Sequence, residues 1–155
     1  PDLSEVNLGD WSDFVANKNN PYDDQGHGTM MAGILVADGG ITGLAINVEL
    51  YVAKALSSNG SGQDSVVADA IDWCITKNVH IISLSLGGAP GVLPFVGGDD
   101  VENAVDDAYS EGIVVVAAAG NDGEDDDGDV ASPGTVSNFW EVEFGNNTFV
   151  AVVLQ

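Results

Sequence analysis

His27 is the residue whose type and position best suit acid–base chemistry. It stands in Gly26-His27-Gly28-Thr29, directly before the apolar run 29–37, which predicts a helix buried on most sides. The start of a helix exposes unpaired N–H groups and a partial positive charge, which favour a neutral imidazole that can act as a base near pH 7. An ordinary histidine near a helix start is the alternative. The segments that follow decide between the two.

Strand and helix patterns alternate along the chain. They predict strands over 48–53, 79–86 and 113–119, helices over 27–38 and 99–111, and between them a helix in which Val67, Ala70, Ile71, Cys74 and Ile75 recur at three- and four-residue steps. Ser61 or Asp64 can cap the second helix. Because the strand runs are rich in β-branched residues and do not alternate, the fold class is α/β: a three-layer arrangement with a parallel β-sheet flanked by helices. Ligands of such sheets bind at the carboxyl ends of the strands.

The two ends of the chain predict different structures. Residues 1–25 have no clear period and predict an irregular approach loop, whereas the run 150–154 has the composition of a strand interior. The chain begins with Pro1 rather than methionine. We therefore expect residues 1–155 to be one partial domain, truncated at both ends of a longer protein.

The charge of the chain limits its partners. The formal net charge is -22, from 25 acids against three lysines and no arginine. Such a surface disfavours nucleic acid and anionic membranes. It suits a concentrated salt medium, in which the Debye length falls to about 3 Å, so we expect a salt-adapted (halophilic) source.

Cysteine content and hydropathy narrow the protein class further. The single cysteine, Cys74, excludes an intrachain disulfide, and its apolar helical neighbours predict a buried small hydrophobe rather than a nucleophile. The sequence contains no run of about 18 apolar residues, so no membrane span is predicted, and no signal peptide is visible.

Four segments in order along residues 1–123 resemble the motifs of the subtilisin-like serine peptidases, or subtilases. Residues 26–33 resemble the histidine motif, and residues 59–63 resemble the segment at the substrate edge. Residues 83–88 resemble the strand beside the specificity pocket, and residues 117–123 resemble the oxyanion-hole segment. Each motif alone is weak, but four in order at family-like intervals make coincidence improbable.

The resemblance implies roles for individual residues. His27 would be the general base, and Asn121 would donate a side-chain N–H to the oxyanion. The residues implied to bind substrate are Gly60, Ser61, Gly62, Ser85, Leu86, Gly87, Ala118 and Gly120. The small, apolar walls of the pocket predict a preference for medium or large apolar side chains before the cut. From the residues alone, Asn121 could instead be a turn residue, Gly60 and Gly62 part of an ordinary loop, and Leu86 a core residue.

Two members of the catalytic triad are missing from this sequence. The family's aspartate would lie at a strand end upstream of Pro1, and its serine downstream of Gln155, because Gly134-Thr135-Val136 is not the nucleophile motif. Asp23 and Asp24 precede His27, but we interpret both as solvated or turn-forming, and His80 as a residue at the core edge.

The resemblance also bears on cofactors, partners and location. Asp2 matches a calcium ligand of some subtilases, which implies a structural calcium ion, and no organic cofactor is implied. The acidic run 122–129 fails the EF-hand register and is interpreted as a solvated insert. We expect a secreted, extracellular monomer that acts on proteins or peptides.

The leading hypothesis is the partial catalytic domain of a serine endopeptidase that works through Asp, His and Ser, inactive as this fragment alone. The alternative is a catalytically inactive subtilase-like module that binds peptides. A nucleotide-binding α/β domain is a third hypothesis, but no Gly-x-Gly-x-x-Gly follows a strand.

Overall fold

A computed structural model describes residues 2–87, 100–118 and 149–154 of the 155-residue chain. The described elements, in chain order, are β1 (Leu8–Asp13), α1 (His27–Val36), β2 (Glu49–Lys54), α2 (Asp64–Thr76), β3 (Ile81–Leu84), α3 (Asp100–Ser110), β4 (Val114–Ala117) and β5 (Phe149–Leu154). No helix within these ranges is long and apolar enough to cross a membrane.

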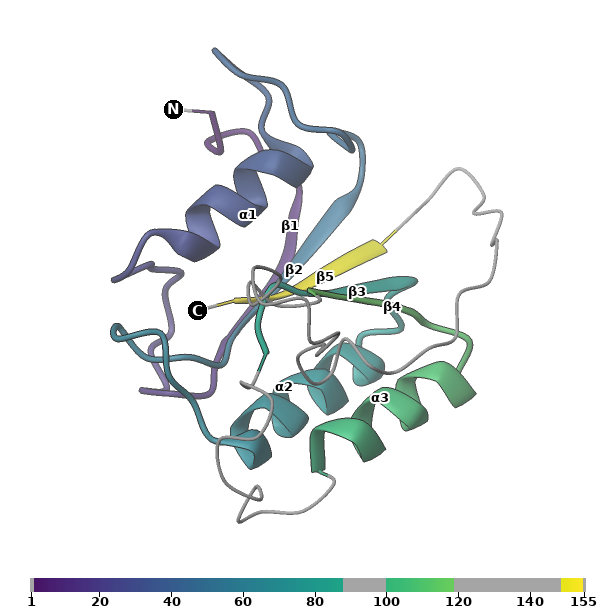
Figure 1. Cartoon of the computed structure of the whole chain (residues 1–155). Helices are drawn as coiled ribbons and strands as arrows, with labels where there is room; N and C mark the ends of the chain where they lie inside the picture. Colours follow the sequence, from purple (N-terminus) through teal and green to yellow (C-terminus); the bar gives the residue numbers. More distant parts are fainter. Residues whose placement is uncertain (1, 88–99, 119–148, 155) are drawn as a thin grey trace, which may run out of the picture.

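The strands form one parallel sheet between two layers of helix. Their order is β1-β2-β5-β3-β4, with β5 in the centre between β2 and β3. Helix α1 lies on one face of the sheet, and α2 and α3 lie side by side on the other (Figure 1). The predicted α/β class and the strand near residue 150 are therefore confirmed. Capping of α2 by Ser61 or Asp64 is wrong, because Gln63 is its N-cap and makes no side-chain cap bond.

The prediction of an irregular loop over residues 1–25 is also wrong, because this segment contains β1. The sequence of β1 has neither β-branched residues nor clean alternation, since it is a largely exposed edge strand that pairs only with β2. Its register is broken between Leu8 and Asp10. A Cβ atom at Gly9 would lie 2.6 Å from the Tyr51 ring, so a side chain there would clash with the neighbouring strand.

The larger core lies between the sheet and the α2–α3 layer. Ile71 and Cys74 of α2 are fully buried against Ile82 of β3 and Val105 of α3. Burial raises the pKa of the Cys74 thiol to about 12, so the thiol stays protonated. Cys74 is thus a buried small hydrophobe, as predicted.

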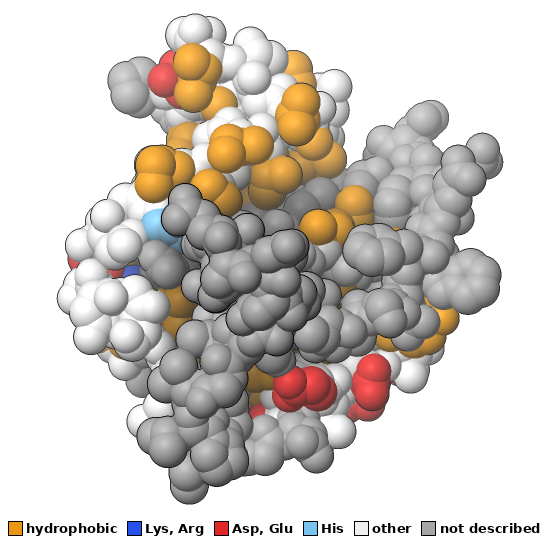
Figure 2. All heavy atoms as spheres, in the orientation of Figure 1, with side chains coloured by type: hydrophobic (Ala, Val, Ile, Leu, Met, Phe, Trp, Pro, Cys, Tyr) orange, Lys and Arg blue, Asp and Glu red, His pale blue; other side chains and the backbone are white. Residues whose placement is uncertain are grey.

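Helix α1 buries only one face. Ala32 and Val36 pack against Leu50 and Val52 of β2, whereas Met30 is 60% exposed and Ile34 is 55% exposed. On the face shown in Figure 2, hydrophobic side chains gather over the end of the molecule that holds α1. Burial on most sides of this helix was therefore a wrong prediction, since no other described element covers its outer face.

Acidic side chains line the seam between α2 and α3. Partial burial raises the pKa of Asp64, and the neighbouring Glu102 and Asp100 carboxylates raise it further. The pKa of Asp72 is raised in the same way, first by burial and then by the Asp107 carboxylate. Figure 2 shows acidic side chains at this end of the molecule. Like charges across the seam therefore oppose the packing of the two helices.

The seam predicts a salt-dependent stability. Replacing Asp72 with Asn removes one of the repelling charges, so we expect the melting temperature in dilute buffer to rise by roughly 1–3 °C. The gain should vanish in molar salt, which already screens the repulsion. Thermal unfolding at both salt concentrations tests this, with Glu5→Gln, an exposed acid outside the seam, as the control. An equal gain at both concentrations would contradict it.

Candidate active site

The site predicted from the sequence lies at the carboxyl edge of the sheet. Since all the described strands are parallel, the segments that follow β2, β3 and β4 leave the sheet at the same edge. The N–H of Ala118, after β4, donates to the carbonyl of Leu84 at the end of β3, at 3.0 Å. The two predicted pocket walls, Ser85–Gly87 and Ala118, are therefore neighbours.

His27 is the first residue of α1. Gly26 before it is left-handed, with φ of 98°, which is a conformation that favours glycine. The backbone N–H of His27 donates to Gln25 Oε1 at 2.9 Å. Ring atom Nδ1 is buried and has no hydrogen-bond partner, and it is the only such buried side-chain nitrogen or oxygen in the described part of the chain. One ring nitrogen is therefore shielded from water and unpaired.

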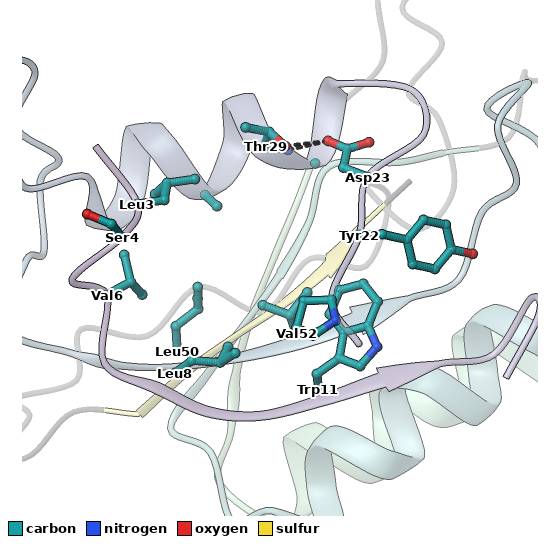
Figure 3. A pocket seen from close by; sticks show the side chains of 13 residues that line it. Leu3, Ser4, Val6, Leu8, Trp11, Tyr22, Asp23, Thr29, Leu50 and Val52 are labelled. Carbon is teal, nitrogen blue, oxygen red and sulfur yellow. Dashed lines mark hydrogen bonds between the residues drawn. The ribbon is translucent and has the colours of Figure 1, made fainter. Parts of the chain in front are cut away.

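Asp23 holds the start of α1. Its carboxylate accepts the backbone N–H groups of Gln25 (2.9 Å), Gly26 (2.7 Å) and Thr29 (2.8 Å), and the Thr29 hydroxyl at 2.6 Å (Figure 3). Burial alone would raise the pKa of Asp23, but the Thr29 hydroxyl and the three N–H donors outweigh burial and hold the pKa well below its usual range. The interpretation of Asp23 as turn-forming is confirmed, and the same carboxylate also fixes the helix start beside His27.

A cavity of about 410 Å³ lies under this first turn of α1. Leu50 and Val52 of β2 and Trp11 of β1 point into it from the sheet, and Thr29 lies at its upper border (Figure 3). Because the space below the turn is not filled by side chains, apolar packing contributes little to its position. The hydrogen bonds to Asp23 take over that role.

Lys54 joins the loop before His27 to the end of β2. Its Nζ lies 2.9 Å from Asp24 Oδ1 and 2.9 Å from the carbonyl oxygen of Leu56. The lysine side chain is 1% exposed, and that of Asp24 is 39% exposed. This contact brings the histidine loop next to the predicted substrate-edge segment.

That segment is a compact turn. The Ser57 N–H donates to the Ser61 carbonyl at 2.9 Å, and the Ser61 N–H donates to Asn59 Oδ1 at 2.9 Å. Gly60 has φ of 80°, and a Cβ atom at Gly62 would lie 2.8 Å from the Ala55 carbonyl oxygen. Both glycines are thus required by the turn itself. The backbone groups of Ser61 are already bonded within it.

Other predicted residues are placed differently. Asn121, Gly120 and the acidic run 122–129 lie outside the described residues. Asp2 Oδ1 accepts the N–H of Gly40, and the Asp2 carbonyl accepts the N–H of Asp38 at 2.9 Å. Among the described residues, no group of three or more His, Cys, Asp or Glu could hold a metal ion. Asp2 therefore organises the loop at 38–40, and a calcium ligand set is not formed by the side chains described around it.

Comparison with known proteins identifies the family. The subtilase family model matches residues 2–150. The chain belongs to the subtilase family. Subtilisin E of Bacillus subtilis is 42% identical over 123 residues, which are 77% of this chain and 31% of that protein. A thermostable alkaline protease of Halalkalibacterium halodurans is 38% identical over 122 residues, 77% of this chain and 32% of that protein.

A solved structure agrees with this assignment. Sphericase is similar with a TM-score of 0.66 and 36% sequence identity, over 79% of this chain and 42% of that one. The chain thus belongs to the subtilisin-like serine peptidases. It spans less than half of the length of these relatives.

Sequence reasoning missed part of the site. Asp24 is exposed, in agreement with its interpretation as solvated or turn-forming, but it also pairs with Lys54, a residue to which the sequence assigned no role. The two residues are 30 positions apart, so no local pattern links them. The signal available was a lysine within the otherwise uncharged, largely apolar run 50–56, since lysine is rarely buried without a partner.

The lowered pKa of Asp23 predicts that the start of α1 loses stability in acid. Because the folded-state pKa lies below the ordinary value near 4, its contribution to stability is present above that value and is lost as the pH falls further. At pH 7, Asp23→Ala should lower the free energy of unfolding by about 1 kcal/mol, as loss of a helix cap does. The difference between wild type and variant should shrink below about pH 4.

Denaturant unfolding at several pH values measures this difference. Asp38→Asn, an exposed acid in the loop after α1, is the control and should leave the difference near zero at every pH. A gap between wild type and Asp23→Ala that stays constant down to pH 2.5 or so would refute the role assigned to the carboxylate.

Proposed function

We propose that the whole protein is a secreted serine endopeptidase in which His27 is the general base. The observation that carries this proposal is the buried, unpartnered Nδ1 of His27 at the carboxyl edge of the sheet. An imidazole that acts as a base needs a carboxylate on its second nitrogen to fix its tautomer and orientation. We assign that partner to the strand-end aspartate expected upstream of Pro1.

The reaction is acyl transfer through a serine expected downstream of Gln155. His27 takes the proton of the serine hydroxyl as its oxygen attacks the scissile carbonyl, and then gives that proton to the leaving amine as the C–N bond breaks. Water hydrolyses the acyl-enzyme by the same steps. The negative charge on the carbonyl oxygen would be met by the side-chain N–H of Asn121, through its place in the family motif.

The substrate would bind in extended form between two segments. Backbone groups of Gly60 and Gly62 on one side and of Ser85–Gly87 on the other would pair with its main chain. Ser61 would support Gly60 and Gly62 rather than pair with the substrate itself, because its own backbone N–H and carbonyl are bonded inside the turn. Leu86, Ala118 and Gly120 would border a small, apolar pocket.

Calcium takes no part in this proposal. A structural calcium ion at Asp2 stays a prediction, because such an ion binds six to eight oxygen atoms and the Asp2 carboxylate, which accepts one backbone N–H, would supply only part of that set. A salt-adapted source remains part of the proposal, supported by the net charge of -22 and the acidic α2–α3 seam.

The whole protein, expressed with its flanking coding sequence, should react with a serine-directed phosphonate and cleave an unstructured protein. His27→Ala should lower kcat by roughly a million-fold, a magnitude that comes from a subtilisin itself. His80→Gln, at the second histidine of this chain, is the matched control and should keep nearly full activity. Peptide binding without labelling or cleavage would instead favour an inactive peptide-binding module.

The pocket predicts the sequence at the cut. Walls of small apolar residues offer no carboxylate to a basic side chain, so cleavage should follow medium or large apolar residues. Mass spectrometry of the products of a denatured protein substrate gives the sites directly. Products that end mainly in lysine or arginine would show that this assignment of the pocket is incorrect.

A further inference from the structure

Lys54 is buried in a chain that has very few cations. The sequence contains three lysines and 25 acids, and yet the Lys54 side chain is only 1% exposed. On the surface, its charge would relieve repulsion between carboxylates, and burying it costs desolvation energy. The other two lysines, Lys18 and Lys77, are both accessible to solvent. The buried position therefore requires a local reason.

The ammonium group of Lys54 has three neighbours. Two are oxygen atoms, Asp24 Oδ1 and the Leu56 carbonyl, each at 2.9 Å. The third neighbour is the Tyr22 ring, whose centroid lies 5.2 Å from Nζ, within the range of a cation–π interaction. These neighbours come from two different loops, which the single lysine holds together.

We propose that Lys54 is a positioning residue that sets His27 against the substrate-edge segment. Asp24 lies three residues before His27, and Leu56 immediately precedes the turn at 57–62. One ammonium thus fixes both the approach to the base and the start of the strand edge that pairs with substrate. This inference rests on the proposed function, and it adds a residue that touches neither the substrate nor the reacting atoms.

Tyr22 extends the connection to β1. Its hydroxyl donates to Asp13 Oδ2 at 3.1 Å, and Asp13, the last residue of β1, is 5% exposed. The Asp13 carboxylate also accepts the N–H groups of Val15, Ala16 and Lys18. The ring beside Lys54 is therefore anchored to the end of the neighbouring strand, which makes the position of the ammonium well defined.

Two substitutions separate the two loops. Lys54→Met keeps most of the volume of the side chain and removes every bond of the ammonium, whereas Asp24→Ala removes only the contact on the histidine side. Lys77→Met is the matched control, because Lys77 also pairs with an aspartate (Asp10, 2.7 Å) and lies 5.1 Å from an aromatic ring, Trp73, but away from His27.

Amide hydrogen exchange in the whole protein tests the connection without following catalysis. Lys54→Met should speed exchange on the order of tenfold in both residues 24–30 and residues 57–62, because both loops lose their common anchor. Asp24→Ala should speed exchange in residues 24–30 alone, and Lys77→Met in neither segment. Unchanged exchange in residues 57–62 of Lys54→Met would overturn the proposal.

Kinetics of the whole protein, per active site titrated with the phosphonate, test the catalytic consequence. Asp24→Ala should lower kcat about tenfold with little change in KM, while Lys54→Met should lower kcat and also raise KM, because the substrate edge moves as well. A merely structural lysine would reduce the number of titrated sites but leave both constants unchanged, and that result would overturn the proposal.

The two proposals fail in different ways. If the wild-type whole protein neither reacts with the phosphonate nor cleaves protein, the proposed function fails, and with it the catalytic role of Lys54. If wild type is active and Lys54→Met matches it in both constants per titrated site, only the positioning role fails.

Discussion

The parallel direction of all the described strands is the constraint on which the site depends. Only in a parallel sheet do the ends of β2, β3 and β4 meet at one edge, and only there can the segments after them face the start of α1. The sheet does not position the histidine by itself. A cavity lies below the first turn of α1, so the turn is fixed by hydrogen bonds to Asp23 and by the pair between Asp24 and Lys54. The sheet thus determines which segments meet at this edge, and the polar contacts fix the position of the first turn of α1 relative to them.

The sequence predicts those elements that composition or spacing marks locally. The β-branched runs of β3 and β4 favour strands by composition, although Val116 of β4 is 50% exposed, and the buried stripe of α2 repeats at helical spacing, so these elements were predicted to within a few residues. β1 was missed because an exposed edge strand needs no apolar pattern. The central place of β5 could not be predicted either, since strand order depends on contacts between segments far apart in sequence.

The candidate site divides in the same way. His27 and the glycine-rich turn could be found from the sequence, because their residue types are tied to local backbone geometry and to a family motif. The Lys54–Asp24 pair could not be found in this way, because the two residues meet only when β2 and the histidine loop come together in the fold. The exposure of Met30 and Ile34 shows the opposite error: an apolar pattern predicted burial that the described elements do not supply.

Four carboxylates of this acidic chain with shifted pKa values form two groups, one near α1 and one in the α2–α3 layer on the other face of the sheet. Near α1, backbone N–H donors outweigh burial and lower the pKa values of Asp13 and Asp23, so these groups stabilise the fold when ionised. In the α2–α3 seam, burial and like charges raise the pKa values of Asp64 and Asp72, so these groups oppose the fold when ionised. Salt weakens the repulsion between carboxylates in the α2–α3 seam, because it screens charges that interact through solvent. It has little effect on the short, directional hydrogen bonds to Asp13 and Asp23. A chain with this division can carry a large negative charge on the helices that face away from the site, while it uses a few carboxylates beside His27 as structural acceptors.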